Sequence, residues 1–200
     1  MTRALIIFLK HPELGLCKTR LAKTIGDSNA LKIYEKLLQH THLITQNLPV
    51  QKYLYFNKEN HKPVHWEGNY HIAYQNQGNL GDKMKVAFAE VFKKPHYPVI
   101  IIGTDCIELT SEIISNAFRQ LNHYDVVIGP AKDGGYYLLG LKNPTPKIFD
   151  NIIWSTNTVL SETIKRVQEL DLTHCFMPVL SDVDVETDLN DELRKLIETS

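Results

Sequence analysis

Short apolar runs alternate along the chain with longer segments whose apolar residues recur every three or four positions. The short runs predict strands at residues 4–9, 53–56, 71–74, 99–102, 125–129, 135–141 and 174–177. The periodic segments predict a helix capped by Asp27 or Ser28, a helix over 84–92 and a helix that follows Thr110. Two more are predicted over 158–170 and in the last segment, which carries Leu189, Leu193 and Leu196. Alternation of this kind is typical of βαβ units, which build a mostly parallel sheet with right-handed crossovers.

One predicted strand breaks the alternation. Segment 135–141 follows the strand at 125–129 after only a short Gly-Gly turn, with no helix between them. A crossover needs a dozen or more residues, so this segment can pair antiparallel. We therefore expect one α/β domain over residues 1–200, a three-layer α/β/α sandwich with a mixed, mostly parallel sheet.

Composition narrows the class of protein. The chain is 43% hydrophobic and 22% charged, which is typical of a globular domain. A formal net charge of −1 argues against a general nucleic-acid binder. We expect a cytoplasmic protein without a membrane span, because no apolar run reaches the length of a signal-peptide core or a transmembrane helix. Its three cysteines are far apart and lack a CxxC pattern, which favours reduced thiols over disulfides or a zinc site.

A basic loop with a glycine directly follows the first predicted strand. It carries Lys10, Gly15, Lys18 and Arg20. Glycine allows close approach of the backbone to an anion, and Lys and Arg neutralise phosphates. The loop is therefore a candidate phosphate site for a nucleotide; the alternative is a solvated basic loop. It does not match the P-loop pattern.

Asp105 lies just beyond the most apolar strand, 99–102. Ligands of open α/β sheets bind outside the carboxyl ends of such strands. Magnesium is commonly held by one or two carboxylates together with substrate phosphates, so Asp105 is a candidate metal ligand. A helix-capping or turn aspartate is the alternative.

Asp182 and Asp184 alternate just before the last helix. In an extended segment this spacing puts both carboxylates on one side, and one of them can be a second metal ligand. Alternatively, Asp184 or a neighbour caps the C-terminal helix.

Three further segments are candidates: two for the acceptor or sugar pocket, and one, with Gln77 and Gly78, for nucleotide or phosphate binding. In the turn Asp133-Gly134-Gly135-Tyr136, the carboxylate can orient a sugar or acceptor hydroxyl and the tyrosine can stack; a plain hairpin with core tyrosines is the alternative. Trp154 is a candidate pocket wall or an ordinary core residue. Gln77 and Gly78 open the second long helix, whose N-terminus favours anions, although Asp82 in its first turn is a simpler partner for the helix dipole.

Taken together, these motifs resemble a known group: a small bacterial glycosyltransferase-like family of uncharacterised function in the nucleotide-diphospho-sugar transferase superfamily. The resemblance runs nearly end to end and rests on Phe8-x-Lys10-x-Pro12-x-x-Gly15-x-x-Lys18-Thr-Arg20-Leu, Gln77-Gly-x-Leu-Gly81, Gly103-Thr-Asp105-Cys, Gly129-Pro-Ala-x-Asp133-Gly-Gly-Tyr-Tyr-Leu, Trp154-Ser-Thr and Asp182-Val-Asp184. The chain departs from the family pattern at Ile107, where proline is usual, and at Val185-Glu186, where Thr-Pro is common.

The resemblance implies a GT-A-like fold that binds a nucleoside diphosphate or triphosphate, with Mg²⁺ or Mn²⁺ at Asp105. It favours glycosyl transfer from a nucleotide-sugar donor to a small-molecule acceptor. Nucleotidyl transfer with release of pyrophosphate is the alternative, because three cations in the first loop suit a triphosphate. A third hypothesis is a domain of this fold that only binds a nucleotide or a partner protein.

Overall fold

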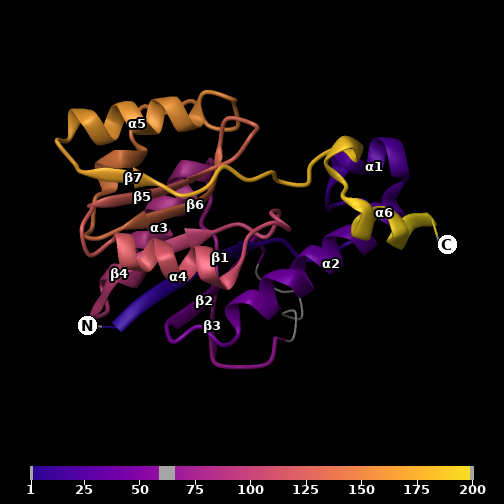
Figure 1. The fold of residues 1–200 in the computed structure, drawn as a ribbon, viewed down its shortest axis with the longest axis horizontal. Helices are drawn as coiled ribbons and strands as arrows, with labels where there is room; N and C mark the ends of the chain where they lie inside the picture. The colour runs from indigo at the N-terminus through magenta and orange to yellow at the C-terminus, as the bar shows by residue number, and fades with distance from the viewer. Residues whose placement is uncertain (1, 59–65, 199–200) are drawn as a thin grey trace.

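Seven strands form one sheet in the order β3-β2-β1-β4-β6-β5-β7 in this computed structural model, which describes residues 2–58 and 66–198 (Figure 1). The strands are β1 (Thr2–Leu9), β2 (Gln51–Phe56), β3 (Tyr70–Tyr74), β4 (His96–Ile102), β5 (Val126–Pro130), β6 (Tyr136–Leu141) and β7 (His174–Phe176). All neighbouring pairs are parallel except those of β6, which is antiparallel to both β4 and β5. The mixed sheet and its one reversed strand are as the sequence predicts.

Helices cover both faces of this sheet. Strand side chains alternate between two clusters, so that Leu5 and Ile7 of β1 face one side while Ala4 and Ile6 face the other. The first side packs against α2 (Asp27–Thr45) and α4 (Ser111–Gln120). The second packs against α3 (Leu80–Phe92), α5 (Val159–Glu169) and the 3₁₀ turn η1 (Pro146–Phe149). This confirms the three-layer architecture.

The order of the strands places a topological switch point between β1 and β4. From β1 the chain adds β2 and then β3 on one side, and β4 pairs with the other side of β1. The loops that leave the carboxyl ends of β1 and β4 therefore diverge at a topological switch point, where ligands of open α/β sheets bind. The β5–β6 turn and the chain after β7 reach the same edge, because β6 is reversed and β7 runs parallel to β5.

A small helical group stands beyond this edge. Figure 1 shows α1 (Thr19–Ile25) and α6 (Asp191–Glu198) beside the start of α2 at one end of the molecule. Their apolar contacts form a separate cluster that includes Leu21, Ile33 and Leu193. Helix α1 is absent from the sequence prediction because it is only seven residues long. Its N-cap, Lys18, has no capping side-chain hydrogen bond and a left-handed backbone, with φ 48°.

Helix termini agree with the sequence prediction in part. Thr110 caps α4, since its hydroxyl accepts a hydrogen bond from the Ile113 N–H at 3.2 Å. For α2 the prediction is wrong: Gly26 is the N-cap and Asp27 is already the first helical residue. Gly26 has φ 81°, a backbone conformation that glycine adopts without strain.

Two further predictions concern the whole chain. Cys17, Cys106 and Cys175 are all free thiols, as expected. Among the described residues, no helix combines the length and the apolar composition that crossing a membrane requires.

Candidate active site

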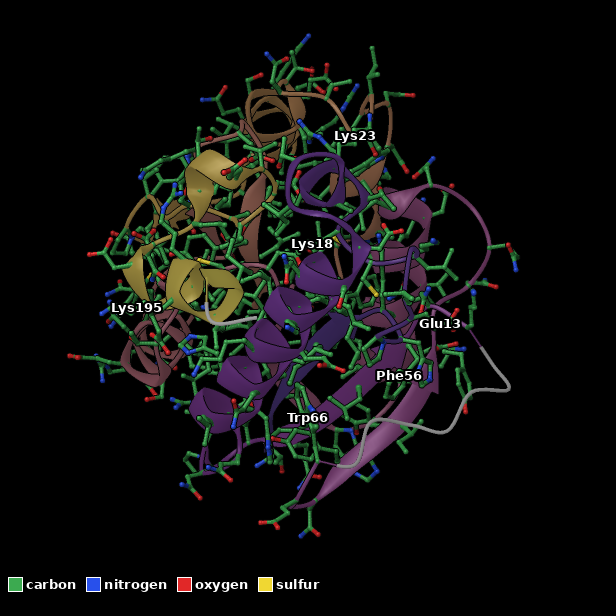
Figure 2. The ribbon with its side chains drawn as sticks, turned by 90° about the vertical axis from the view of Figure 1, so that its right-hand side faces the viewer. Glu13, Lys18, Lys23, Phe56, Trp66 and Lys195 are labelled. Carbon is green, nitrogen blue, oxygen red and sulfur yellow. The ribbon has the colours of Figure 1, made fainter. Side chains whose placement is uncertain are left out.

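An ion pair joins the first loop to the end of the central strand. The Lys18 ammonium nitrogen lies 2.5 Å from Asp105 Oδ1. The Lys18 side chain is only 5% exposed, whereas Asp105 is 48% exposed. Figure 2 looks onto this end of the molecule and shows Lys18 near its centre. A buried ammonium is stable only with a charged partner, and Asp105 is that partner here. The ion pair therefore joins the loop that predicts phosphate binding to the aspartate that predicts metal binding.

A second acidic segment closes over this pair from the C-terminal part of the chain. Arg20 Nη1 lies 2.7 Å from Asp184 Oδ2, and Lys18 Nζ lies 3.9 Å from Asp184 Oδ1. The Val183 N–H donates to the Asp105 carbonyl at 2.9 Å, and the Val183 side chain is buried in the α1–α2–α6 cluster. Alternation about this buried valine directs Asp182 and Asp184 away from that cluster, as the sequence spacing predicts.

Asp184 does not cap the last helix. The amide oxygen of Asn190 does so, accepting from the Leu193 N–H at 2.9 Å. Asp188, in the 3₁₀ turn η2 (Glu186–Asp188), accepts from the N–H groups of Asp184 and Val185. This turn fixes the backbone beside Asp184, so its carboxylate is left to the two cations.

Asp182 is half-buried near other carboxylates. Desolvation by burial, followed by the charges of Asp105 and Asp133, raises the pKa of Asp182 to about 7, against the partial opposition of Lys18. Asp184 adds a smaller effect in the same direction. This electrostatic coupling indicates that carboxylates from three segments of the chain, those of Asp105, Asp133 and Asp182–Asp184, share one edge of the sheet. No three described Asp, Glu, His or Cys side chains form a ready-made metal cage.

The raised pKa of Asp182 predicts a pH-dependent stability. Between pH 3.8 and about 7 the folded chain keeps a proton that the unfolded chain releases, so this residue lowers the free energy of unfolding as pH rises. We expect Asp182→Asn to be more stable than the wild type at pH 8 by about 2 kcal/mol. This is half of what a three-unit shift represents, because the residue is partly solvent accessible.

Urea denaturation at pH 8 and at pH 4 measures this effect, with Asp191→Asn, an exposed carboxylate on α6, as the control. The gain of Asp182→Asn is expected to disappear at pH 4. A gain that is equal at both pH values would show that ionisation of the Asp182 carboxyl does not destabilise the folded state.

Tyr34 fixes the first loop and was missed by sequence reasoning. Its hydroxyl accepts from the Lys10 N–H at 2.8 Å and donates to the Lys10 carbonyl at 3.0 Å. Burial raises its pKa, and the Thr104 hydroxyl opposes this shift. Tyr34 therefore connects the loop after β1 with the loop after β4. The helical periodicity had placed it simply on the core face of α2. The Lys10 residue itself is exposed, so its contact with a ligand stays a prediction.

The first loop is folded back by a thiol. Cys17 Sγ accepts from the Glu13 N–H at 3.2 Å and donates to the His11 carbonyl at 3.1 Å. Burial raises the pKa of Cys17, which keeps the thiol protonated and able to donate. Gly15 at the loop tip has φ 74°, a conformation that disfavours any other residue.

The Asp133 turn is a tight hairpin at the same edge. Asp133 Oδ1 accepts from the Gly135 N–H at 2.9 Å, and the Gly134 carbonyl accepts from the Leu160 N–H at 2.9 Å. The Asp133 residue is otherwise exposed and is electrostatically coupled to Asp182. The hydroxyl oxygen of Tyr136 is buried, and this burial raises the pKa of the side chain. The residue as a whole is partly exposed, and its stacking on a ligand stays a prediction.

Trp154 and the start of α3 lie against each other. The indole of Trp154 occupies the space that a Cβ on Gly81 would need, and its ring centroid is 6.3 Å from that of Phe149. Asn79 and Asp82 form a capping box with hydrogen bonds of 3.0 and 3.1 Å, which confirms Asp82 as the partner of the helix N-terminus. Gln77 and Gly78 are exposed beside it, and their nucleotide contact stays a prediction.

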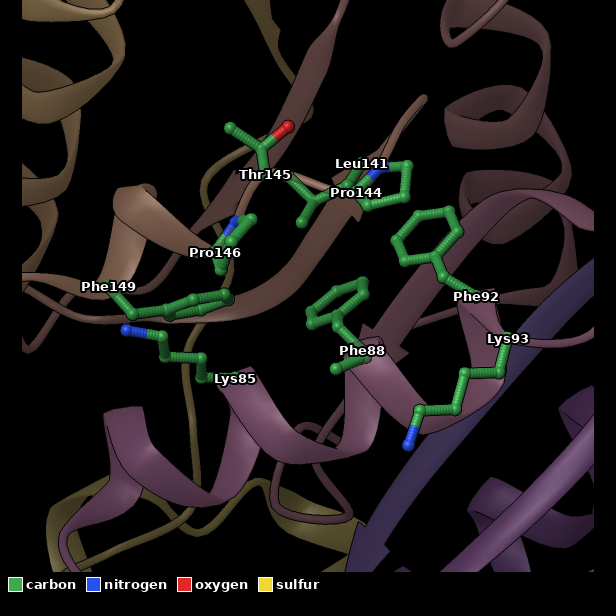
Figure 3. A pocket seen from close by; sticks show the side chains of 10 residues that line it. Lys85, Phe88, Phe92, Lys93, Leu141, Pro144, Thr145, Pro146 and Phe149 are labelled. Atoms are coloured by element: carbon green, nitrogen blue, oxygen red, sulfur yellow. The ribbon is translucent and has the colours of Figure 1, made fainter.

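A cavity of about 240 Å³ lies elsewhere, between α3 and the segment that follows β6 (Figure 3). Its walls are mainly Phe88, Phe92, Phe149 and two prolines. Leu141, on its lining, pairs with Val99 and Val126 near the beginnings of β4 and β5. The cavity is therefore at the amino edge of the sheet and contains none of the predicted site residues.

Solved structures resemble the whole chain. A protein from Desulfovibrio desulfuricans G20, described as a candidate nucleotide-diphospho-sugar transferase, is 27% identical with a TM-score of 0.88, over 100% of this chain and 98% of that one. The inositol-1-phosphate CTP transferase of T. maritima is 11% identical with a TM-score of 0.62, over 98% and 95% of the two chains. A Mycobacterium tuberculosis H37Rv protein, solved as a complex with manganese, is 11% identical with a TM-score of 0.54, over 99% and 98%.

The last two likenesses show the fold alone. The likeness to the Desulfovibrio protein identifies this fold as that of the GT-A-like nucleotide-diphospho-sugar transferases. No curated protein sequence matches the chain. A family model described as an uncharacterized protein conserved in bacteria (DUF2064) matches residues 41–156, more than half of the chain. The match contains Asp105, Asp133 and Trp154, and leaves the first loop and the Asp182–Asp184 segment outside it. On this evidence the chain belongs to the DUF2064 family.

Proposed function

We propose that this protein is a metal-dependent glycosyltransferase that uses a nucleotide-diphospho-sugar donor. The observation that carries the proposal is the meeting of the buried Lys18 ammonium with Asp105 and Asp184 at the switch point of the sheet. The cations are suited to bind phosphates, and the carboxylates are suited to bind a hard metal ion. The two kinds of group are in direct ion-pair contact.

The first loop binds the diphosphate of the donor in this proposal. Lys18 and Arg20 contact its oxygens, Arg20 with a planar fork that can hold two of them, and Lys10 adds a third cation at the end of β1. Gly15 lets the loop backbone come close to the phosphates, and Gln77 and Gly78 line the nucleotide side. Tyr34 acts only as a positioning residue, through its two hydrogen bonds to the Lys10 backbone.

The carboxylates fit a divalent cation. Asp105 and Asp184 or Asp182 would hold Mg²⁺ or Mn²⁺, because oxygen donors of this kind are the ligands these ions prefer. When bound, the ion would neutralise charge on the diphosphate leaving group. Asp133, coupled to the cluster but exposed, is suited to accept a hydrogen bond from an acceptor or sugar hydroxyl. Gly134, Gly135, Tyr136 and Trp154 would form the wall of this pocket.

Nucleotidyl transfer is the second candidate. Three cations in the first loop can accommodate a triphosphate, and the fold is shared with a CTP transferase. The two activities differ in the bond that breaks. Glycosyl transfer breaks the bond between the sugar and the diphosphate, whereas nucleotidyl transfer breaks the bond between the α- and β-phosphates and releases pyrophosphate.

Thermal unfolding with a panel of nucleotides and nucleotide sugars tests the proposal, each with and without Mg²⁺ or Mn²⁺. A ligand at 100 times its Kd adds about 2.7 kcal/mol to the free energy of unfolding. We expect metal-dependent stabilisation by one nucleoside diphosphate and its sugar. Stabilisation by triphosphates alone, followed by pyrophosphate release, would replace glycosyl transfer with nucleotidyl transfer. No stabilisation by any of them would refute both activities and favour a binding domain.

A further inference from the structure

The cations and the carboxylates of the candidate site already bind each other. Lys18 lies 2.5 Å from Asp105, and Arg20 lies 2.7 Å from Asp184. Each cation that would bind the diphosphate is therefore paired with a carboxylate that would bind the metal ion. A metal ion therefore competes with Lys18 and Arg20 for the carboxylates, and a diphosphate competes with Asp105 and Asp184 for the cations.

Lys18 is the residue on which this competition depends most. Its side chain is 5% exposed, so the ammonium cannot turn into water when it leaves Asp105. Its backbone is fixed as the left-handed N-cap of α1, and Leu21, three residues later, is fully buried. A cation at Asp105 without an anion at Lys18 would leave two positive charges side by side in a partly dry site. That arrangement costs free energy, because charges repel strongly where water is excluded.

Arg20 forms a similar ion pair with Asp184, at a position that is more exposed to solvent. Its side chain is 69% exposed, and that of Asp184 is 43% exposed. Exposed ion pairs contribute about 0–1 kcal/mol, so this pair hinders ligand binding less than the Lys18–Asp105 pair does. Lys23, on the same short helix, is exposed and has no ion-pair partner among residues 2–58 and 66–198 (Figure 2).

We propose that the metal ion and the diphosphate bind this site cooperatively, because each releases the residue that the other needs. The diphosphate draws Lys18 and Arg20 away from the carboxylates, and the metal ion takes the carboxylates that they leave. This inference rests on the proposed function and adds to it a rule for loading the site. Since binding free energies are linked, each ligand should raise the affinity for the other by the same factor.

Manganese binding in the absence of nucleotide tests the role of Lys18 directly. Electron paramagnetic resonance of free Mn²⁺ gives the Kd for the wild type, Lys18→Met, Arg20→Met and the control Lys23→Met. We expect Lys18→Met to bind Mn²⁺ about tenfold more tightly than the wild type, since Asp105 is then unpaired. Arg20→Met should gain a smaller factor, and Lys23→Met less than about twofold, because it removes the same charge at an exposed position. Arg20→Met also serves as the test if Lys18→Met does not fold.

The second measurement is Mn²⁺ affinity at saturating UDP, GDP, CDP or ADP, corrected by a titration of each nucleotide without protein. Tighter Mn²⁺ binding with nucleotide, reduced in Lys18→Met, supports cooperative loading. Independent binding of the two ligands, or equal Mn²⁺ affinity in Lys18→Met and Lys23→Met, overturns it and leaves the proposed function intact. Absence of any Mn²⁺ and nucleotide binding by the wild type would overturn both proposals.

Discussion

Asp105→Asn is expected to lower the transfer rate by about 10²- to 10³-fold, the range observed when one preorganised electrostatic contact at the reacting group is removed. The substitution keeps the shape of the side chain and one oxygen near Lys18, but removes the charge that a metal ion needs. We also expect the metal-dependent part of nucleotide stabilisation to disappear. Steady-state kinetics and thermal unfolding with and without Mn²⁺ measure the two effects.

The matched control is Asp191→Asn, which removes one carboxylate from an exposed position on α6. It should leave both measurements unchanged, because the last helix contributes no carboxylate to the cluster around Lys18. If Asp105→Asn retained full transfer and full metal dependence, Asp105 would have no metal-binding role. The carboxylates of Asp182 and Asp184 would then be the remaining candidates.

Gly134→Ala is expected to lower the free energy of unfolding by about 3 kcal/mol, and Tm by roughly 6–12 °C. Gly134 has φ 91°, which strains any residue with a side chain. A Cβ there would also overlap the backbone carbonyl of Asn157, so the segment before α5 would have to move. Because Leu160 donates to the Gly134 carbonyl, the start of α5 would shift with it.

Gly135→Ala is the control for this prediction. Its φ is not positive, and the atom nearest to an added Cβ is a side-chain oxygen of Asp133 at 3.3 Å, which can move slightly. We expect a loss below about 1 kcal/mol, the usual cost of an ordinary surface substitution. Equal losses in the two variants would mean that the close packing on Asn157 does not stabilise the fold. Circular dichroism melts of both proteins decide the matter.

Asp105→Asn is expected to affect the transfer rate, whereas Gly134→Ala is expected to affect the stability of the fold, although both residues lie at the same edge of the sheet. Asp105 is held by the buried end of β4, Val99 to Ile102, and by the hydrogen bond that its carbonyl accepts from the Val183 N–H. The Asp133 turn instead depends on glycine conformations and on contacts with the segment before α5. In the proposed function, the metal ligand Asp105 therefore lies on a rigid strand end, whereas the acceptor side depends on loop contacts.

The sequence by itself determined the local structure and the list of chemical groups. Apolar runs and helical periodicity located the strands and most helices, because side-chain alternation follows directly from backbone geometry. The short Gly-Gly connection also predicted that β6 is antiparallel, since no crossover fits in it. Asp105 was identifiable because it follows an apolar strand within three residues. A carboxylate in that place lies at the carboxyl edge of the sheet.

Only the tertiary structure decided which of these groups meet. Lys18, Asp105 and Asp184 are far apart in the chain, and their contacts depend on strand order and on the packing of α1, α2 and α6. Helix α1 escaped prediction because a seven-residue helix is marginal alone and is stabilised by burial of Leu21. The role of Tyr34 escaped it because periodicity reports that a residue faces inward, but not which backbone its hydroxyl reaches. Long-range packing, which no local pattern encodes, therefore fixed the ion pairs on which the proposed chemistry depends.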